Sequence, residues 1–379
     1  MRKTRLPFPL YPEVIVLLLL ALAQTLYLGN SARADEDELE LVQSVSVPDV
    51  RGICCLAISN DGKFAYSAAA RAGALVVFKR NADSGELTIA DSLKAPVVNG
   101  PQRVRISADD KYLVLADSRA NAATIFARDP ASGALTKVTE ATGDLESITD
   151  AHLSPDNHFL YAATPVDLKV YRFAEGKLDF VQKADAEGGL KGLRPFTFSP
   201  DGRWLYAAAE ISGSLTVFRR DEAGGKLEVT QSLNNESDGI STLAGAYRVD
   251  ASLDGKHVYV SSGRYRGDKA ITVFAMQPDG QLKWVQHLVN ETGDFTEFEG
   301  GNEIRVSPNG KLVYAVASES DRLFRFSRDP ESGKITFVTS QQAGVFIPIG
   351  AAGVCFSPDG RFVYVSDQSE NAIEVYKVR

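Results

Sequence analysis

The chain has 379 residues, and 49 acidic side chains against 41 basic ones give it a formal net charge of −8. An acidic surface repels phosphate backbones and anionic lipids, so nucleic acid and membrane surfaces are poor candidates for partners. The 3 cysteines are too few to build a fold on disulfides.

The first 34 residues are typical of a secretory signal peptide. Arg2, Lys3 and Arg5 precede a nearly continuous apolar run over residues 14–28, and Ala32-Arg33-Ala34 is a small-x-small cleavage site. The run is shorter than the ~20 residues of a membrane-spanning helix. We therefore expect cleavage after Ala34, a single domain over residues 35–379, and a secreted or periplasmic protein with no membrane contact. An uncleaved anchor is the alternative.

One pattern recurs seven times in the rest of the chain: an apolar strand, a turn of the form Ser-x-Asp/Asn-Gly, and a second strand. The turns begin at Ser59, Ser107, Ser154, Ser199, Ser252, Ser307 and Ser357, at intervals of 45 to 55 residues. Self-similarity with this period is typical of a propeller blade or a solenoid unit. Glycine takes the positive φ of such a turn, and Asp110 and Asn157 are expected to do so where glycine is missing.

Each repeat contains four short strands and no helical periodicity, which indicates a propeller blade. A Gly-x-Leu/Ile hairpin leads into the fourth strand in six repeats, but the last repeat stops at its third strand, residues 373–376. Residues 39–45 resemble the fourth strand at 227–233, so we expect them to supply the missing strand and cover the open edge. The predicted fold is all-β: a seven-bladed β-propeller with four-stranded blades, closed by the N-terminal strand.

The innermost strand of each blade carries polar residues two and four positions before the turn serine. They are Arg103 and Arg105, Asp150 and His152, Arg248 and Asp250, and Glu303 and Arg305. Because side chains alternate along a strand, these residues share one face, and charges of both signs are expected to meet near the axis. One interpretation is a self-satisfied network between blades. The other is a pocket for a small anionic or carbonyl-bearing ligand held by arginine.

The sequence predicts no cofactor and no metal. It contains no Cys-x-x-Cys, His-Glu-x-x-His, phosphate-binding loop or dinucleotide fingerprint. His158 and His257 are expected beside surface turns and His287 in an outer strand, which leaves His152 as the single inward histidine. Cys54, Cys55 and Cys355 are expected to be buried thiols, with a bridge from Cys54 or Cys55 to Cys355 as the alternative.

The repeated turns and the Gly-x-Leu hairpins together resemble the lactonase family of seven-bladed propellers, which includes 6-phosphogluconolactonases and fungal carboxymuconate cyclases. The resemblance covers about residue 38 to the end of the chain. It implies four site positions. Arg194 in Gly192-Leu193-Arg194-Pro195 matches the first arginine, and Glu210 matches the glutamate. The histidine position falls on Thr149, three residues before His152, and the second arginine position falls on Asn302.

The resemblance implies that Glu210 acts as general acid or base and that Arg194 holds a carboxylate or developing oxyanion. His152 is the third catalytic candidate, and the binding candidates are Asp150, Arg248, Asn302, Glu303 and Arg305. The first hypothesis is an exported lactonase that opens or forms a lactone of an anionic, sugar-like or carboxylate substrate. Phosphorylated sugar lactones belong to the cytoplasm and do not suit an exported chain. The alternative is a non-catalytic exported binding or scaffold propeller, with a protein partner also compatible; a metal-dependent hydrolase ranks third.

Overall fold

The computed structural model describes residues 39–378 apart from 49, 238, 264–266 and 343–350. One compact unit spans Leu41–Val378; the other comprises Met1–Glu40 and Arg379, of which only Leu39 and Glu40 are described. The expected signal peptide and its cleavage site therefore lie outside the described residues. Within the described part, no helix has the length and apolar character that crossing a bilayer requires.

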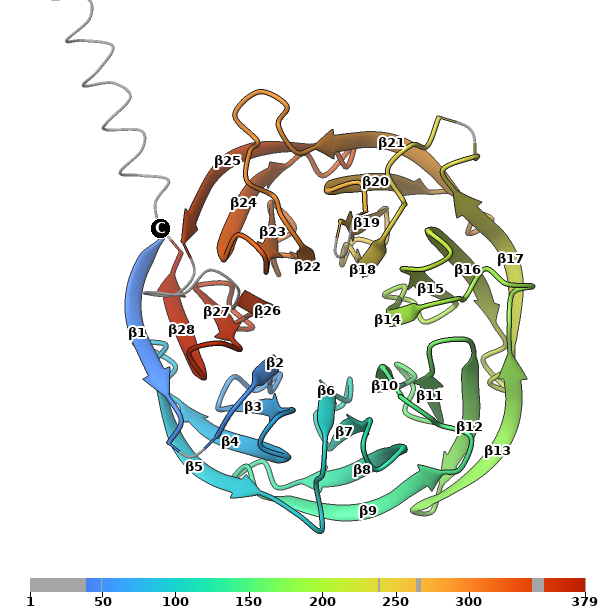
Figure 1. Cartoon of the computed structure of the whole chain (residues 1–379). Helices are drawn as coiled ribbons and strands as arrows, with labels where there is room; N and C mark the ends of the chain where they lie inside the picture. Colours follow the sequence, from blue (N-terminus) through green and yellow to red (C-terminus); the bar gives the residue numbers. More distant parts are fainter. Residues whose placement is uncertain (1–38, 49, 238, 264–266, 343–350, 379) are drawn as a thin grey trace, which may run out of the picture. The chain divides into compact units, whose positions relative to one another are not determined.

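The large unit is a ring of seven four-stranded antiparallel sheets (Figure 1). Each of the first six blades uses four consecutive strands, the first next to the axis. Blades one to three comprise β2 (Ile53–Ile58), β3 (Phe64–Ala69), β4 (Ala74–Arg80) and β5 (Leu87–Leu93); β6 (Pro101–Ile106), β7 (Tyr112–Asp117), β8 (Ala122–Arg128) and β9 (Leu135–Thr142); and β10 (Asp150–Leu153), β11 (Phe159–Ala163), β12 (Leu168–Ala174) and β13 (Lys177–Ala184).

Blades four to six repeat this order. They comprise β14 (Leu193–Phe198), β15 (Trp204–Ala209), β16 (Ser214–Arg220) and β17 (Leu227–Asn234); β18 (Ala246–Ala251), β19 (His257–Ser262), β20 (Ala270–Met276) and β21 (Leu282–Val289); and β22 (Gly301–Val306), β23 (Leu312–Ala317), β24 (Arg322–Arg328) and β25 (Ile335–Gln342).

The seventh blade joins the two ends of the chain. Its inner strands are β26 (Ala351–Phe356), β27 (Phe362–Asp367) and β28 (Ala372–Lys377), and its outermost strand is β1 (Glu40–Ser46), which pairs with β28. Figure 1 shows β1 in blue beside β28 in red. The predicted seven blades and the predicted closure by the N-terminal strand are both confirmed.

The turn at Ser199 shows why the serine pattern recurs. The Ser199 hydroxyl donates to Asp201 Oδ1 at 2.5 Å and accepts from the backbone N–H of Trp204 at 3.0 Å, so one side chain ties both ends of the turn. Gly202 takes a φ of 71°. Asp110 and Asn157 take φ values of 64° and 60° at the equivalent place, as predicted.

The core lies between neighbouring blades. Six hydrophobic clusters each combine side chains of two adjacent blades, and the second strands β3, β11 and β15 are almost wholly buried. The hairpin glycines allow this close packing. A Cβ on Gly225, whose φ is 76°, would lie 2.2 Å from Phe159 of the preceding blade. The repeated Gly-x-Leu hairpin is therefore a packing requirement as well as a turn signal.

Buried tyrosines link one blade to the next. Tyr364 donates to the carbonyl of Gly85 at 2.8 Å and accepts from Arg80 Nε at 2.6 Å, which joins the last blade to the first. His257 belongs to a similar link, because its Nδ1 lies 2.9 Å from Arg328 Nη2. His257 directly follows a repeated turn, as expected, but its ring is buried where blades five and six meet.

Candidate functional site: two cavities along the axis

A buried layer of charge crosses the axis of the ring. Glu303 on β22 accepts hydrogen bonds from Arg103 Nη2 at 2.9 and 3.1 Å and from Arg248 Nε at 3.2 Å, and Arg305 Nε lies 3.2 Å from its other oxygen. Glu303 is 2% exposed. Burial alone would raise the pKa of its carboxyl, but Arg103, Arg305 and Arg248 outweigh burial and hold that pKa well below its usual range.

Two further ion pairs flank this layer. Arg105 binds Asp150 through Nη2 at 2.7 Å and Nε at 3.3 Å. Asp250 accepts from Arg305 Nη1 at 3.2 Å and from the backbone N–H of Val306 at 2.9 Å. Burial opposes ionisation of Asp150, but Arg105 outweighs it and lowers the pKa, whereas burial dominates at Asp250 and raises it. The prediction that charges of both signs meet near the axis is confirmed.

A β-bulge near the start of the innermost strand decides where the next side chains point. In six of the seven blades the register shifts by one residue there, for example between Pro101 and Arg103 on β6 and between Ala246 and Arg248 on β18. A bulge turns two consecutive side chains toward the same side of a strand. Tyr247 and Arg248 consequently line one pocket together.

We call this pocket the Arg194 pocket. It has a volume of about 310 Å³ and is lined by Gln102, Arg103, Ser118, Ser147, Ile148, Thr149, Arg194, Pro195, Tyr247 and Arg248. The guanidinium carbons of Arg194 and Arg248 lie 5.0 and 4.6 Å from the centre of the Tyr247 ring. Three arginines with hydroxyl and amide side chains, and no acidic residue in the described lining, make this an anion-binding environment.

Glu210 contacts Arg194 from outside this pocket. It follows β15, and its Oε2 accepts from Arg194 Nε at 2.6 Å and also from Nη2. Glu210 itself lines a separate surface depression of about 310 Å³, together with Ser212 and Asn235. Glu210 therefore fixes the Arg194 guanidinium without lining the Arg194 pocket.

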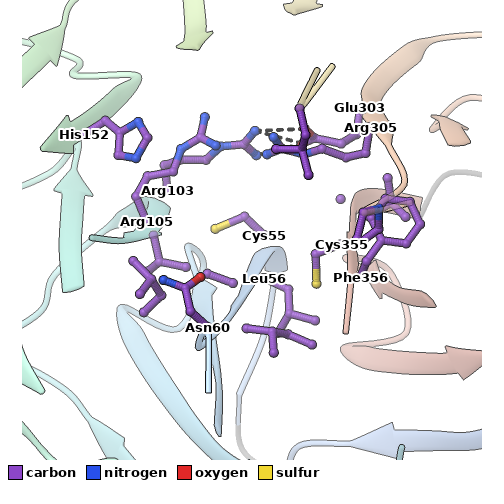
Figure 2. Close-up of a pocket in the computed structure, with 18 residues that line it drawn as sticks. Cys55, Leu56, Asn60, Arg103, Arg105, His152, Glu303, Arg305, Cys355 and Phe356 are labelled. Carbon is purple, nitrogen blue, oxygen red and sulfur yellow. Dashed lines mark hydrogen bonds and ion pairs between the residues drawn. The ribbon is translucent and has the colours of Figure 1, made fainter. Parts of the chain in front are cut away.

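His152 lies in a different cavity, which we call the central cavity. Its volume is about 440 Å³, and its lining includes Cys55, Arg103, Arg105, Glu303 and Arg305 (Figure 2). The His152 ring packs 5.5 Å from the Phe198 ring. Burial, with help from Arg105, lowers its pKa to about 3, so the imidazole is neutral at physiological pH. His152 thus does not line the pocket of its proposed partner Arg194.

The remaining candidates divide between the two cavities or belong to neither. Arg248 lines the Arg194 pocket, while Glu303 and Arg305 line the central cavity. Asn302 is buried and donates to the carbonyl of Ala352 at 2.8 Å, so its amide helps to hold β22 beside β26. Thr149, at the position of the family histidine, lines the Arg194 pocket.

The site candidates named from the sequence did not include Arg103, Arg105, Tyr247 or Cys55, which line the two cavities. Arg103 lines both cavities and was recognisable by its phase relative to Ser107. Tyr247 faces its pocket because of the bulge, and no residue type in the sequence indicates that a bulge is present. All three cysteines are free thiols. Within the described ranges, no group of three His, Cys, Asp or Glu side chains has the geometry of a metal site.

Comparison with known proteins gives relatives at low identity. A protein of unknown function from Lactococcus lactis subsp. cremoris is 24% identical over 163 residues, which cover 41% of this chain and 45% of that one. The match therefore spans just under half the length of this curated relative.

Solved structures share the fold. The periplasmic gluconolactonase PpgL of Pseudomonas aeruginosa superposes with a TM-score of 0.64 at 24% identity, covering 77% of this chain and 85% of that one. A Bacteroides uniformis protein proposed to be a 6-phosphogluconolactonase superposes with a TM-score of 0.63 at 22% identity, covering 75% and 83%.

The family model described as "Lactonase, 7-bladed beta-propeller" matches residues 31–147 and 150–345, which is most of the chain. This match agrees with the repeated turns and with the seven blades. The chain therefore belongs to the lactonase family of seven-bladed β-propellers.

Proposed function

We propose that the protein is a lactonase that acts on a carboxylate-bearing or otherwise anionic, sugar-like lactone bound in the Arg194 pocket. The observation that carries this proposal is the meeting of Arg103, Arg194 and Arg248 in one pocket, which no acidic side chain among the described residues lines. Guanidinium groups bind carboxylates in a bidentate manner and stabilise the oxyanion that forms when water adds to an ester carbonyl.

In the proposed reaction, water adds to the acyl carbon of the lactone and the ring C–O bond breaks. The product is a hydroxy acid, which releases a proton. Arg194 and Arg248 donate to the substrate carboxylate and to the developing oxyanion. Glu210 is best placed as a positioning residue, because it holds Arg194 by two hydrogen bonds from outside the pocket. A general acid or base role for Glu210 requires the reacting atom to reach the outer side of Arg194.

Export belongs to the same proposal. We infer that residues 1–34 direct secretion, which favours a non-phosphorylated substrate. The similarity to a periplasmic gluconolactonase supports this choice of substrate class.

The test measures acid release in a pH-stat with 5-oxotetrahydrofuran-2-carboxylate, an anionic lactone, and with gluconolactone, a neutral one. Replacing Arg194 with alanine should lower kcat/KM for the anionic lactone roughly 100-fold or more, the usual loss for an oxyanion donor. Arg219→Ala removes an equivalent arginine from an exposed pair with Glu228 and should leave turnover unchanged.

Glu210→Gln separates the two roles of the carboxylate. A positioning residue loses roughly tenfold in kcat, because glutamine still accepts a hydrogen bond, and the pH profile keeps its shape. If Glu210 is instead the general base, the variant should lose the acid limb of its pH–rate profile, because that limb reports the ionisation of the carboxylate. Absence of lactone turnover in the wild-type protein, or turnover that survives Arg194→Ala, rejects the lactonase proposal.

A second candidate is a non-catalytic binding propeller. It is favoured by Thr149 and Asn302, which occupy the positions where the family places a histidine and an arginine. Binding of the anionic lactone without ring opening, measured by calorimetry, supports this candidate.

A further inference from the structure

The central cavity lies at the other end of the innermost strands from the Arg194 pocket. Its lining reaches Asn60, Leu253 and Pro308, which belong to the repeated turns where these strands end. The Arg194 pocket is instead lined by residues near the strand starts, such as Gln102 and Tyr247. Arg103 is the one described residue that lines both, so the charged layer around Glu303 separates two distinct cavities.

Two arginines of the central cavity are held by ion pairs but each keeps a hydrogen-bond donor that has no acceptor among the described residues. Arg105 binds Asp150 through Nε and Nη2, and among the described residues nothing accepts from its Nη1. Arg305 binds Asp250 through Nη1 and faces Glu303 through Nε, and within the same described part its Nη2 has no acceptor. The side chains of Arg105 and Arg305 are 13% and 23% exposed, so these two donors are open to the cavity and can donate to a ligand there.

His152 adds a third polar atom without a partner. Its Nδ1 is buried and makes no hydrogen bond in the described part of the chain. Arg105, Arg305 and His152 line the same cavity, so the two guanidiniums and the imidazole can face one ligand. Apolar side chains complete the wall, among them Ile58, Ile106 and Phe356.

We infer that the central cavity is a second ligand site, which binds a small organic carboxylate with an apolar body. The carboxylate accepts from Arg105 and Arg305, and the body packs against Ile58, Ile106 and Phe356. The planar fork of a guanidinium matches a carboxylate in a bidentate manner. An apolar wall favours such an amphipathic acid over inorganic phosphate, and the volume of about 440 Å³ is within the usual range for small-molecule sites.

Cys55 provides a reporter inside the cavity. Figure 2 shows its sulfur directed toward the arginine side chains of β6. Burial would raise the pKa of the Cys55 thiol, but the hydrogen bond from Cys54 and the charge of Arg103 outweigh burial and lower it to about 7. A thiol that is partly ionised near neutral pH reacts with alkylating agents, so its labelling rate reports access to the cavity.

The experiment labels the Cys54→Ser/Cys355→Ser protein, in which Cys55 is the single thiol, with iodoacetate or iodoacetamide. A positively charged cavity concentrates the anionic reagent, so the iodoacetate-to-iodoacetamide rate ratio should exceed that of glutathione roughly tenfold. Benzoate should slow labelling by either reagent, whereas benzamide, its neutral analogue, should not. Arg105→Lys, which keeps the charge but loses the planar fork, should weaken protection by benzoate roughly tenfold.

Two variants locate the effect. Ala57→Phe fills the cavity without removing a charge and should abolish protection by benzoate. Arg194→Ala empties the other pocket and should leave protection unchanged, so this result does not depend on whether the protein is a lactonase. Any of four results would overturn the inference. Cys55 could resist both reagents, or the ratio of the two labelling rates could equal that of glutathione. Benzamide or phosphate could protect as well as benzoate does, or protection by benzoate could be undiminished in Ala57→Phe.

Discussion

Replacing Glu303 with glutamine tests whether the charged layer holds the propeller together at its axis. Glutamine has nearly the same shape but no charge, so Arg103, Arg248 and Arg305 lose their common anion. Burial together with Arg103 already lowers the pKa of Arg248 to about 10, which marks it as the least compensated guanidinium of the three. We expect Glu303→Gln to destabilise the fold and to disturb both cavities.

The magnitude follows from the burial of the pair. Removing one partner of a buried ion pair costs about 3–5 kcal/mol, because the other charge stays buried without compensation. With about 2.1 cal mol⁻¹ K⁻¹ of unfolding entropy per residue over roughly 340 residues, this loss lowers Tm by about 4–7 °C. The dependence of stability on pH should also change on the acid side. Glu303 ionises more readily in the folded state, so its contribution is present above pH ~4 and is lost as the pH falls toward the folded pKa.

Differential scanning calorimetry at pH 7 measures the shift. Glu228→Gln removes the same charge from an exposed pair with Arg219 and should change Tm by less than about 1 °C. The double variant Glu303→Gln/Arg248→Met should be destabilised by less than the sum of the two single changes, because it removes an uncompensated cation. A Tm of Glu303→Gln equal to that of Glu228→Gln, or strict additivity in the double variant, would refute this account of the layer.

Two other predictions concern buried polar groups. Tyr364→Phe removes the hydroxyl that links Gly85 and Arg80 and should cost about 1–3 kcal/mol in urea unfolding, while Tyr314→Phe, whose buried hydroxyl has no partner among the described residues, should be neutral or slightly stabilising; equal losses would contradict the link. Burial and Asp367 raise the pKa of Asp321 to about 6, so the folded state keeps a proton that the unfolded state loses and wild-type stability falls as the pH rises from ~4 to 6. Asp321→Asn should therefore gain in Tm over the wild type across this interval, and a constant difference between pH 4 and 7 would contradict the raised pKa.

The fold was predictable because its signals are local and repeated. The hydrogen bonds of Ser199 to Asp201 and Trp204 lie within six residues, so each turn can be recognised from a short stretch of sequence. The closing strand was recognisable because residues 39–45 repeat the pattern of residues 227–233. The burial of the His257 ring was not predictable in this way, because the ring contacts Arg328, 71 residues away.

The candidate site was predictable only in part, because the two cavities draw on different positions of the repeat. Counting back from each turn serine, the charged and imidazole side chains of the central cavity hold positions two and four, among them Arg105, His152 and Arg305. Strict alternation along a strand is enough to find these residues. The Arg194 pocket uses the position five residues before the serine, which alternation assigns to the apolar core face.

The bulge explains this exception. By adding one residue between the first ladder pairs, it moves position five from the core face to the channel, where Gln102, Arg194 and Tyr247 meet. Thr149 lines the same pocket from blade three, whose inner pair of strands has no such register shift. Position five also holds Asn302, so three of the four places implied by the family resemblance lie at this position of three different blades. The seven residues at position five of the seven blades share no chemical type. A single sequence therefore gives no sign that this position faces the channel. A ring built in this way can change its ligand by substituting position five, while the turns, the hairpin glycines and the charged layer remain as they are.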